Sequence, residues 1–338
     1  MRPLYYCQTS LVCLIPLLCN PLSLVAAAPQ PQQPDNNDNK AQSKRGVAYQ
    51  GDKHKADNRL LFSPESPVDW YYTWSLWPAP EAGDGVEFLP LVHSTDDLSS
   101  RSKADAFRKQ LDGLPRSSTH LLTFNEPDGD TGSGGSAIEP KDAARAYIDH
   151  IAPLRSSSGD GGRTWNVSHP SVTGSPRGLD WLRRFNESCW DLDREKGVPD
   201  RLRRRALLKF WITEMALPQQ DDKATLSMMN QTLPYLDKLD YVAGYAWFGA
   251  FRKGEKANQW TGDQVSLFNN DGGLTELGSM YLSSGNGGEN KDGGGFEPGK
   301  KGPPGKDDDE GAAAGIRPKS RWAAVLTGVA VAASLVAW

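Results

Sequence analysis

The sequence predicts an α/β fold in which parallel strands alternate with helices, most simply a (β/α) barrel. Short apolar runs of strand length alternate along the chain with amphipathic stretches of helix length, which is the pattern of a parallel sheet made of βα units. The region between two low-complexity segments spans roughly 240 residues, which suits one large domain better than two. Two of the apolar runs end on a glutamate, and the functional groups of such barrels project from the carboxyl ends of the strands.

The predicted elements cover this domain from one end to the other. Strands are predicted at 46–50, 68–74, 87–92, 120–124, 165–173, 210–213 and 242–247. Helices are predicted at 104–111, 141–154, 179–186, 224–239 and 274–282. The helix at 224–239 shows the pattern best, because Leu226, Met229 and Leu233 recur every three or four residues and form one apolar face.

The first 28 residues indicate a cleaved secretory signal peptide. Arg2 precedes an apolar stretch at 11–18, and the small residues at 26–28 supply a cleavage site. A membrane anchor is the alternative, but Pro16 interrupts a run that is already short for a bilayer. Residues 29–43 are rich in Pro, Gln, Asn and Asp and are predicted to be disordered, ahead of the folded domain at 44–282.

Beyond that domain the composition changes twice. Residues 283–315 are dominated by Gly, Lys, Asp and Pro without apolar periodicity, which predicts a flexible tether that ends in small residues. Residues 316–338 combine a polar basic spacer with an apolar tail, and this order is typical of a GPI-attachment signal. A transmembrane helix is the alternative, although no charged residue follows the tail. We expect a secreted protein at the cell surface or cell wall, with a lipid anchor in the plasma membrane.

Cysteine usage, charge and glycosylation motifs fit this expectation. Three of the four cysteines lie in the predicted signal peptide, so Cys189 stays alone in the mature chain, either as a buried thiol or as half of a lost pair. The formal net charge of -4, with acidic and basic residues intermingled, gives no reason to expect a nucleic-acid partner. Acceptor sequons begin at Asn186 and Asn230, and a third at Asn166 falls in a predicted strand.

Paired carboxylates at the ends of two strands indicate glycosidic bond cleavage. Glu126 follows the strand at 120–124, and Glu214 follows the strand at 210–213. Cleavage with retention needs one carboxyl group to protonate the leaving oxygen and another to attack the anomeric carbon, about 5 Å apart. The fourth and seventh strands of a barrel face one another across its mouth, so both glutamates are candidate catalytic residues. A single glutamate after a strand is more often a helix cap or a surface acid, and the prediction therefore depends on the pair.

Three further residues are predicted to bind substrate. The amide of Asn125, next to Glu126, can hydrogen-bond a sugar 2-hydroxyl group. Trp74 and Trp247 stand at strand ends among clustered aromatic residues, and the flat faces of sugar rings stack on such side chains. The other aromatic residues of these clusters are expected in the core.

The chain resembles glycoside hydrolase family 128, the fungal cell-wall proteins with an alkali-sensitive-linkage-type catalytic domain. The resemblance covers about residues 44–282 and is carried by Asn125-Glu126-Pro127-Asp128, Ser171-Val172-Thr173, Gly178-Leu179-Asp180-Trp181-Leu182, Trp211-Ile212-Thr213-Glu214 and Tyr245-Ala246-Trp247-Phe248. It implies a (β/α)8 barrel of the retaining clan that cleaves β-1,3-glucan as a monomer, with Glu126 as acid/base and Glu214 as nucleophile. Tyr245, two residues before Trp247, is a further candidate for substrate binding. Family members need no metal or other cofactor, and the histidines show no ligand spacing.

One departure from the family pattern concerns the sixth βα unit. Family members carry a strand and a helix between the Trp-Leu helix and the Trp-x-Thr-Glu strand. Here only residues 190–210 separate Cys189 from Trp211, which is too short for a strand, a helix and their turns. We expect that this unit is missing or degenerate, through loss or through a skipped exon.

Three hypotheses about function follow. The first is an endo-β-1,3-glucanase that remodels wall glucan, as the carboxylate pair indicates. The second is a glucan-binding wall protein with little or no activity, as the missing unit would favour. The third is a related enzyme that acts on another β-glycan, because a carboxylate pair alone does not select the linkage.

Overall fold

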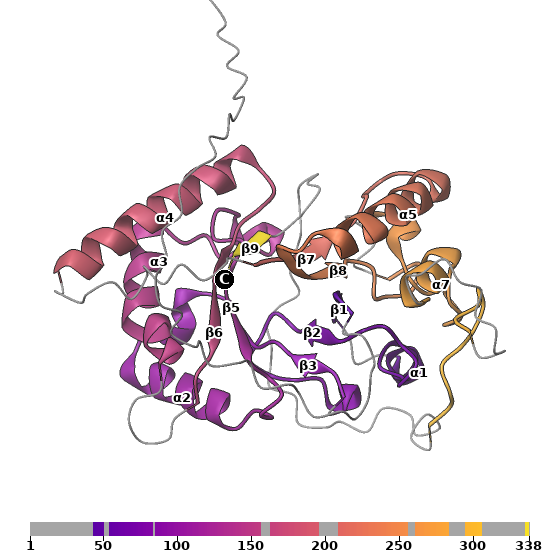
Figure 1. Ribbon diagram of the computed structural model, residues 1–338, viewed down its shortest axis with the longest axis horizontal. Helices are drawn as coiled ribbons and strands as arrows, with labels where there is room; N and C mark the ends of the chain where they lie inside the picture. The colour runs from indigo at the N-terminus through magenta and orange to yellow at the C-terminus, as the bar shows by residue number, and fades with distance from the viewer. Residues whose placement is uncertain are drawn as a thin grey trace, which may run out of the picture. The chain divides into compact units, whose positions relative to one another are not determined.

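Parallel strands covered by helices form the domain, which confirms the predicted α/β class. The computed structural model describes residues 43–50, 54–83, 85–156, 163–195, 209–255, 261–283, 295–305 and 335–337 (Figure 1). The strands are β1 (Arg45–Ala48), β2 (Trp70–Tyr72), β3 (Glu87–Phe88), β4 (Leu91–Val92), β5 (His120–Asn125), β6 (Asn166–Ser171), β7 (Phe210–Met215), β8 (Val242–Trp247) and β9 (Leu335–Ala337). Every ladder among β1 to β8 is parallel.

The helices lie where the sequence predicts them, with one addition. They are α1 (Lys55–Leu61), α2 (Arg101–Asp112), α3 (Pro140–Ala146), α4 (Pro176–Glu195), α5 (Asp222–Lys238) and α7 (Glu276–Leu282). Helix α1 was not expected from the sequence, and α4 extends well beyond the predicted 179–186. The predicted helix at 141–154 begins as α3 and continues through a π turn and a 3₁₀ turn to Arg155.

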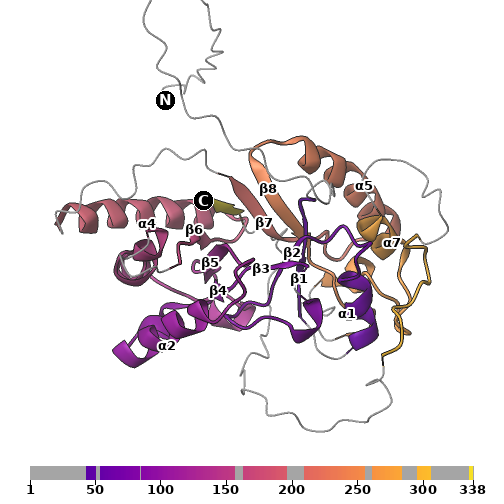
Figure 2. The same cartoon turned by 60° about the horizontal axis from the view of Figure 1, so that its bottom comes forward.

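The strands form two sheets, and the chain crosses from the first to the second between β3 and β4. The sheet orders are β3-β2-β1-β8-β7-β9 and β4-β5-β6, and Figure 2 shows α5 alongside β7 and β8. The predicted strand at 87–92 divides into β3, which pairs with β2, and β4, which pairs with β5. Pro90 lies at the division and has no N–H group for a ladder, so the chain passes from one sheet to the other at that point.

The edge of β7 that does not pair with β8 takes β9 as an antiparallel neighbour. The pairs are Phe210↔Ala337, Trp211↔Val336 and Ile212↔Leu335. Among the described residues, β6 pairs with β5 alone, and β6 and β7 share no ladder. Residues 196–208, which precede β7, lie outside the described residues, so the predicted absence of a sixth unit stays a prediction.

Aromatic rings fill the interior between β1, β2, β7 and β8. The rings of Trp70 and Trp211 meet edge to face with centroids 4.8 Å apart. A Cβ atom added at Gly46 would lie 2.1 Å from the ring of Trp70, and one added at Gly244 would lie 2.7 Å from the ring of Trp211. Glycine on β1 and β8 therefore gives these two indoles their space.

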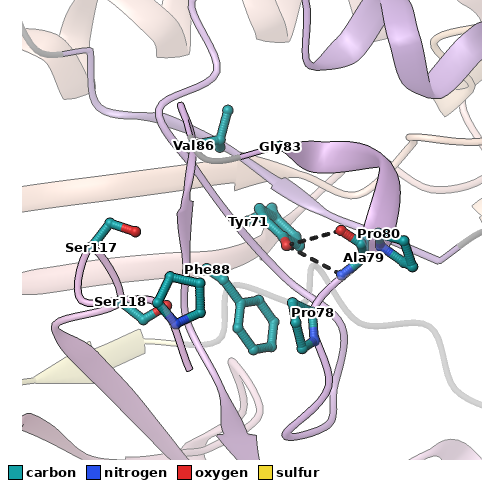
Figure 3. Close-up of a pocket in the computed structure, with 10 residues that line it drawn as sticks. Tyr71, Pro78, Ala79, Pro80, Gly83, Val86, Phe88, Ser117 and Ser118 are labelled. Carbon is teal, nitrogen blue, oxygen red and sulfur yellow. Dashed lines mark hydrogen bonds between the residues drawn. The ribbon is translucent and has the colours of Figure 1, made fainter. Parts of the chain in front are cut away.

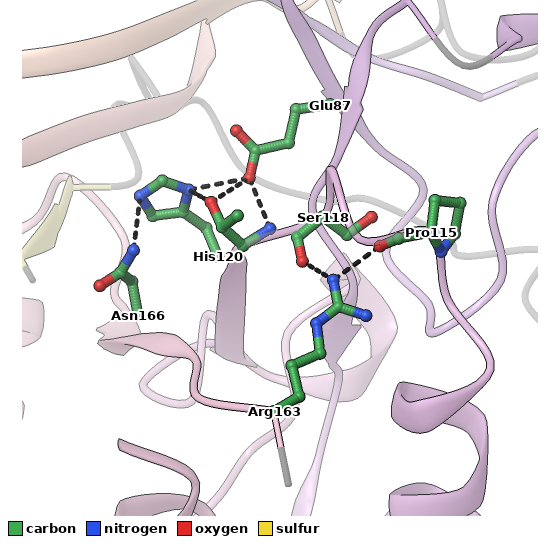
Figure 4. Close-up of polar contacts among 7 residues, drawn as sticks. Glu87, Pro115, Ser118, His120, Arg163 and Asn166 are labelled. Atoms are coloured by element: carbon green, nitrogen blue, oxygen red, sulfur yellow. Dashed lines mark hydrogen bonds and ion pairs between the residues drawn. The ribbon is translucent and has the colours of Figure 1, made fainter. Parts of the chain in front are cut away.

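A polar cluster occupies the amino ends of three strands (Figure 4). Glu87 Oε1 lies 2.9 Å from Nδ1 of His120, and Nδ2 of Asn166 lies 3.4 Å from the other ring nitrogen of His120. Burial would raise the pKa of Glu87, but the hydrogen bond and the charge of His120 lower it overall. Because all three residues begin their strands, this cluster lies at the end of the sheets opposite to the carboxyl ends.

A cavity of about 190 Å³ lies between the segment that leads into β3 and the turn that precedes β5 (Figure 3). Its lining includes Tyr71, Phe88 and Ser118, together with prolines of both segments. Ala79 donates its amide to the Tyr71 hydroxyl group at 3.2 Å, and this hydroxyl group lies 3.4 Å from the Ala79 carbonyl oxygen. Neither predicted catalytic glutamate lines this cavity.

Candidate active site

Glu126 and Glu214 come together at the carboxyl ends of β5 and β7. Glu126 is the residue directly after β5, and Glu214 is the last residue but one of β7. Glu126 keeps 9% of its surface exposed, and Glu214 is partly exposed. Their charges interact, since the charge of Glu214 contributes to the raised pKa of Glu126. The structure therefore brings the two predicted catalytic acids into one site.

The backbone around Glu126 is strained. Phe124 has a φ of 40° and Glu126 a φ of 39°, both in the left-handed region that non-glycine residues rarely adopt. Such residues cost about 1–3 kcal/mol each and persist where the surrounding contacts fix them. Here the Glu126 amide donates to the Ser171 carbonyl oxygen at 2.7 Å, and the Glu126 carbonyl oxygen accepts from the Gly129 amide at 2.8 Å. These bonds hold the chain in the turn that delivers the carboxyl group.

Two donors hold one oxygen of Glu214, one on β2 and one just after β2, in the same sheet as β7. The Tyr72 hydroxyl group donates to Oε1 of Glu214 at 2.9 Å, and the Trp74 indole N–H donates to the same oxygen at 2.8 Å. Trp74 also has a positive φ of 53°. With both bonds on Oε1, the second oxygen of Glu214 is the one that can attack a substrate. Within the described residues, the carboxyl group of Glu126 has no comparable donor.

This difference in hydrogen bonding separates the two acids chemically. Burial, the charge of Glu214 and the charge of Asp128 together raise the pKa of Glu126 to about 8, with burial the largest cause. Burial also raises the pKa of Glu214, but the bonds from Trp74 and Tyr72 favour its ionised form and oppose that rise. Hydrogen bonds therefore favour the ionised form of Glu214 and give no such support to Glu126.

Asn125 and Trp74 lie beside the two acids. Asn125 is 6% exposed, and its Nδ2 atom donates to the Gly134 carbonyl oxygen at 3.1 Å, which fixes the amide next to Glu126. The ring of Trp74 lies 4.8 Å from that of Tyr72 and 6.1 Å from that of Phe248, and Trp74 remains partly exposed. The most direct role of Trp74 in this structure is to bind Glu214.

Tyr245 and Trp247 are not brought to the surface of the site. Both are fully buried, so neither presents a ring face to a sugar as the sequence interpretation expected. The Tyr245 hydroxyl group donates to Asp237 at 2.7 Å, and the Trp247 indole donates to the Val265 carbonyl oxygen at 2.9 Å. Each aromatic polar group thus has a partner inside the domain, which is the usual condition for burying such a side chain.

Sequence reasoning missed Tyr72 and Asp128. Tyr72 was expected in the core and is fully buried there, but its hydrogen bond to Glu214 was not foreseen. Trp70, Tyr72 and Trp74 alternate in sequence, and the ring of Tyr72 lies near the rings of both tryptophans. That period of two was the available signal. The charge of Asp128 contributes to the raised pKa of Glu126. The position of Asp128 in Asn125-Glu126-Pro127-Asp128 did not indicate that its side chain binds Thr173.

The described part of the chain contains no cluster of three or more histidine, cysteine or acidic side chains that could hold a metal ion. It likewise contains no helix with the length and apolar character needed to cross a bilayer. Cys189, on α4, is a buried thiol whose pKa burial raises to about 12.

Comparison with known proteins gives a family and a fold. The model of the family described as "Glycosyl hydrolase catalytic core" matches residues 46–281. Alkali-sensitive linkage protein 1 of Schizosaccharomyces pombe is 27% identical over 237 residues. That alignment covers 64% of this chain and 40% of the relative, so this chain spans well under half of the relative's length.

Three solved structures share the fold. The first is a GH128 subgroup VI exo-β-1,3-glucanase from Aureobasidium namibiae, with a TM-score of 0.54 and 18% identity, covering 72% of this chain and 97% of that one. The second is a GH128 subgroup II endo-β-1,3-glucanase from Sorangium cellulosum, with a TM-score of 0.51 and 21% identity, covering 71% of this chain and 98% of that one. The third is a GH128 subgroup I endo-β-1,3-glucanase from Amycolatopsis mediterranei in complex with laminaritriose, with a TM-score of 0.50 and 18% identity, covering 71% of this chain and 98% of that one. At these identities the likeness concerns the fold.

Proposed function

We propose that this chain, which belongs to the glycosyl hydrolase catalytic core family within glycoside hydrolase family 128, is an endo-acting β-1,3-glucanase that retains anomeric configuration. The observation that carries the proposal is the interacting pair Glu126 and Glu214, of which only Glu214 accepts strong donors. A retaining glycosidase needs this inequality, because one carboxyl group must be protonated while the other is ionised.

The proposed reaction has two steps. Glu126 protonates the glycosidic oxygen while the second oxygen of Glu214 attacks the anomeric carbon, which forms a glycosyl-enzyme ester and releases the leaving sugar. Glu126, now ionised, takes a proton from water as that water attacks the same carbon and frees Glu214. Asn125, fixed beside Glu126, is placed to hydrogen-bond the 2-hydroxyl group of the sugar in both steps.

β-1,3-Glucan is the proposed substrate because the named solved structures are β-1,3-glucanases and one of them holds laminaritriose. Incubation of the purified chain with laminarin, mannan and cellulose, followed by detection of reducing ends, tests this choice. Early release of mixed oligosaccharides from laminarin would support endo action. Release of glucose alone would indicate exo action, and binding to laminarin without release would favour a glucan-binding protein.

The proposed setting is the fungal cell wall. We propose that the chain is secreted as a monomer, loses residues 1–28, and is anchored at the cell surface after removal of 316–338. A fungal setting is supported by the relative in Schizosaccharomyces pombe. Asn186 on α4 and Asn230 on α5 are exposed and are the proposed glycan acceptors, whereas Asn166 begins β6 and hydrogen-bonds His120.

The pH dependence of kcat/KM should be bell-shaped. Glu126 must be protonated, so kcat/KM should fall as pH rises through about 8. Glu214 must be ionised, so kcat/KM should also fall at acidic pH, where Glu214 becomes protonated. The two limbs belong to the interacting pair. Initial rates on laminarin, measured from pH 3 to 10 at intervals of roughly half a pH unit, would define both limbs. An aryl glucoside with a good leaving group needs little protonation, and its alkaline limb should be flattened. A laminarin profile that is flat through pH 8 would contradict the role of Glu126.

Replacing Tyr72 with Phe should impair Glu214 selectively. The change removes one of two donors to Oε1, so the pKa of Glu214 should rise and the acid limb should move to higher pH. We expect kcat to fall about tenfold, the loss typical of one hydrogen bond to a charged group. Tyr71→Phe is the matched control, because the Tyr71 hydroxyl group contacts Ala79 instead. Equal kinetics for the two variants would refute the role of Tyr72.

A further inference from the structure

We infer that Asp128 and Thr173 form a clamp that positions Glu126 for proton transfer, and that the buried charge of Asp128 acts on Glu126 from within this clamp. The inference rests on the proposed function, because it assigns a positioning role within the same site. It concerns two residues that do not touch the reacting atoms and that act through Glu126.

The clamp joins the loop after β5 to the turn after β6. The side chain of Asp128 has no exposed surface, and its Oδ1 accepts from the Thr173 amide at 2.9 Å. Its Oδ2 accepts from the Thr173 hydroxyl group. Two residues earlier on both segments, the Glu126 amide donates to the Ser171 carbonyl oxygen at 2.7 Å. The two segments are therefore hydrogen-bonded at two successive places, and Glu126 lies at the first of them.

The turn after β6 is shaped to receive Asp128. A Cβ atom at Gly178 would lie 2.5 Å from the Thr173 carbonyl oxygen and 3.2 Å from Oδ2 of Asp128, so only glycine leaves room there. The Thr173 hydroxyl group also lies 2.9 Å from that of Ser175, which begins the turn into α4. These contacts give a physical role to the Ser171-Val172-Thr173 and Gly178-Leu179 motifs, which the two carboxylates alone do not explain.

A second anchor fixes the far side of the same loop. The indole N–H of Trp181 on α4 donates to the Ile138 carbonyl oxygen at 2.7 Å, and the Ile138 amide donates to the Pro127 carbonyl oxygen at 2.9 Å. Helix α4 thus holds the loop that carries Glu126 and Asp128 from two directions. This support is what the strained φ of Glu126 requires in order to persist.

The charge of Asp128 acts on Glu126 together with its neighbours. The groups that face this region are Glu214 from β7, Tyr72 from β2, Asp128 from the loop itself and Arg177 from α4. Burial, the charge of Glu214 and the charge of Asp128 all raise the pKa of Glu126. Arg177 lies 3.9 Å from Oδ2 of Asp128, but its side chain is 70% exposed, so solvent screens it and the negative charge of Asp128 remains effective.

Asp128→Asn, Thr173→Val and Thr173→Ser separate charge from geometry. Asp128→Asn keeps the shape but removes the charge, so the alkaline limb of kcat/KM on laminarin should move down by about one pH unit. Thr173→Val keeps the charge but loses one donor, so kcat should fall about five- to tenfold with the limb unmoved. Thr173→Ser should restore wild-type kinetics. Asp180→Asn, which removes an exposed acid of α4 that pairs with Arg183, is the matched control and should change neither quantity.

A direct titration makes the test independent of hydrolysis. Carbon NMR of glutamate-labelled protein, with Glu126→Gln used to assign the signal, would give the pKa of Glu126 in wild type and in Asp128→Asn. A lower pKa in Asp128→Asn supports the inference, even if the chain releases no sugar and the proposed function fails. An unchanged pKa overturns it. A uniform loss of kcat at every pH in Asp128→Asn, with an unmoved alkaline limb and a lower melting temperature, would also overturn it in favour of a purely structural contact.

Discussion

Glu214→Gln is expected to reduce kcat on laminarin by about 10⁴-fold or more, because an amide cannot attack the anomeric carbon. The replacement has the same shape and keeps an oxygen that can accept from Tyr72 and Trp74, so the fold should persist. Reducing-end assays with purified wild type and variant would measure the loss. Circular dichroism melts of the same samples would show that both are folded.

The same variant tests whether the two acids share a site without any appeal to activity. The charge of Glu214 raises the pKa of Glu126, so Glu214→Gln should lower that pKa in the NMR titration described above. Glu187→Gln, at an exposed acid on α4, is a control that should leave both the pKa and the rate unchanged. A Glu214→Gln enzyme that kept a tenth of wild-type activity would show that Glu214 is not the nucleophile.

Glu126→Ala is expected to lower hydrolysis of laminarin by about 10²–10⁴-fold and to be rescued by azide on an activated substrate. An aryl glucoside with a good leaving group can form the ester with Glu214 without help from an acid. Water then attacks the ester slowly because its base is missing, whereas azide needs no base and fits the space that the carboxyl group leaves. The product should be a β-glycosyl azide, since two displacements at one carbon retain its configuration. Chromatography and proton NMR would identify it.

The outcome separates Glu126 from Glu214. If the roles were exchanged, azide would rescue Glu214→Ala and give an α-glycosyl azide by a single displacement. Loss of activity in Glu126→Ala without any rescue would contradict the assignment of Glu126 as acid/base. The alanine variant is preferred to glutamine here because the smaller side chain leaves room for the anion.

The strands and the acid pair could be predicted from the sequence, because each depends on local pattern. The strand at 242–247 agrees with β8 residue for residue, and Glu126 and Glu214 stand at strand ends as expected. Parallel strands place their carboxyl ends at one edge, so two acids at such ends are brought together by topology alone. No knowledge of side-chain packing was needed for that step.

The surroundings of the acids could not be predicted, because they depend on which segments cover them. Trp247 stands at a strand end, yet its indole N–H donates to the carbonyl oxygen of Val265 in the 3₁₀ turn Asp263–Val265. Its backbone amide donates to the hydroxyl group of Tyr281 on α7. That cover comes from sequence about twenty to thirty residues away, and periodicity along β8 does not reveal it. For the same reason, the hydrogen bond that Trp74 donates to Glu214 was not foreseen, and its predicted contact with sugar stays a prediction.

Strand β9 belongs to residues 316–338, which the proposed lipid attachment would remove. Leu335–Ala337 pairs with Phe210 to Ile212, directly before Thr213 and Glu214. Precursor and mature forms would therefore differ in the neighbour of the nucleophile's own strand. A single proteolytic event at the membrane would then both fix where the protein resides and leave a row of backbone amides and carbonyls open beside its reactive carboxylate.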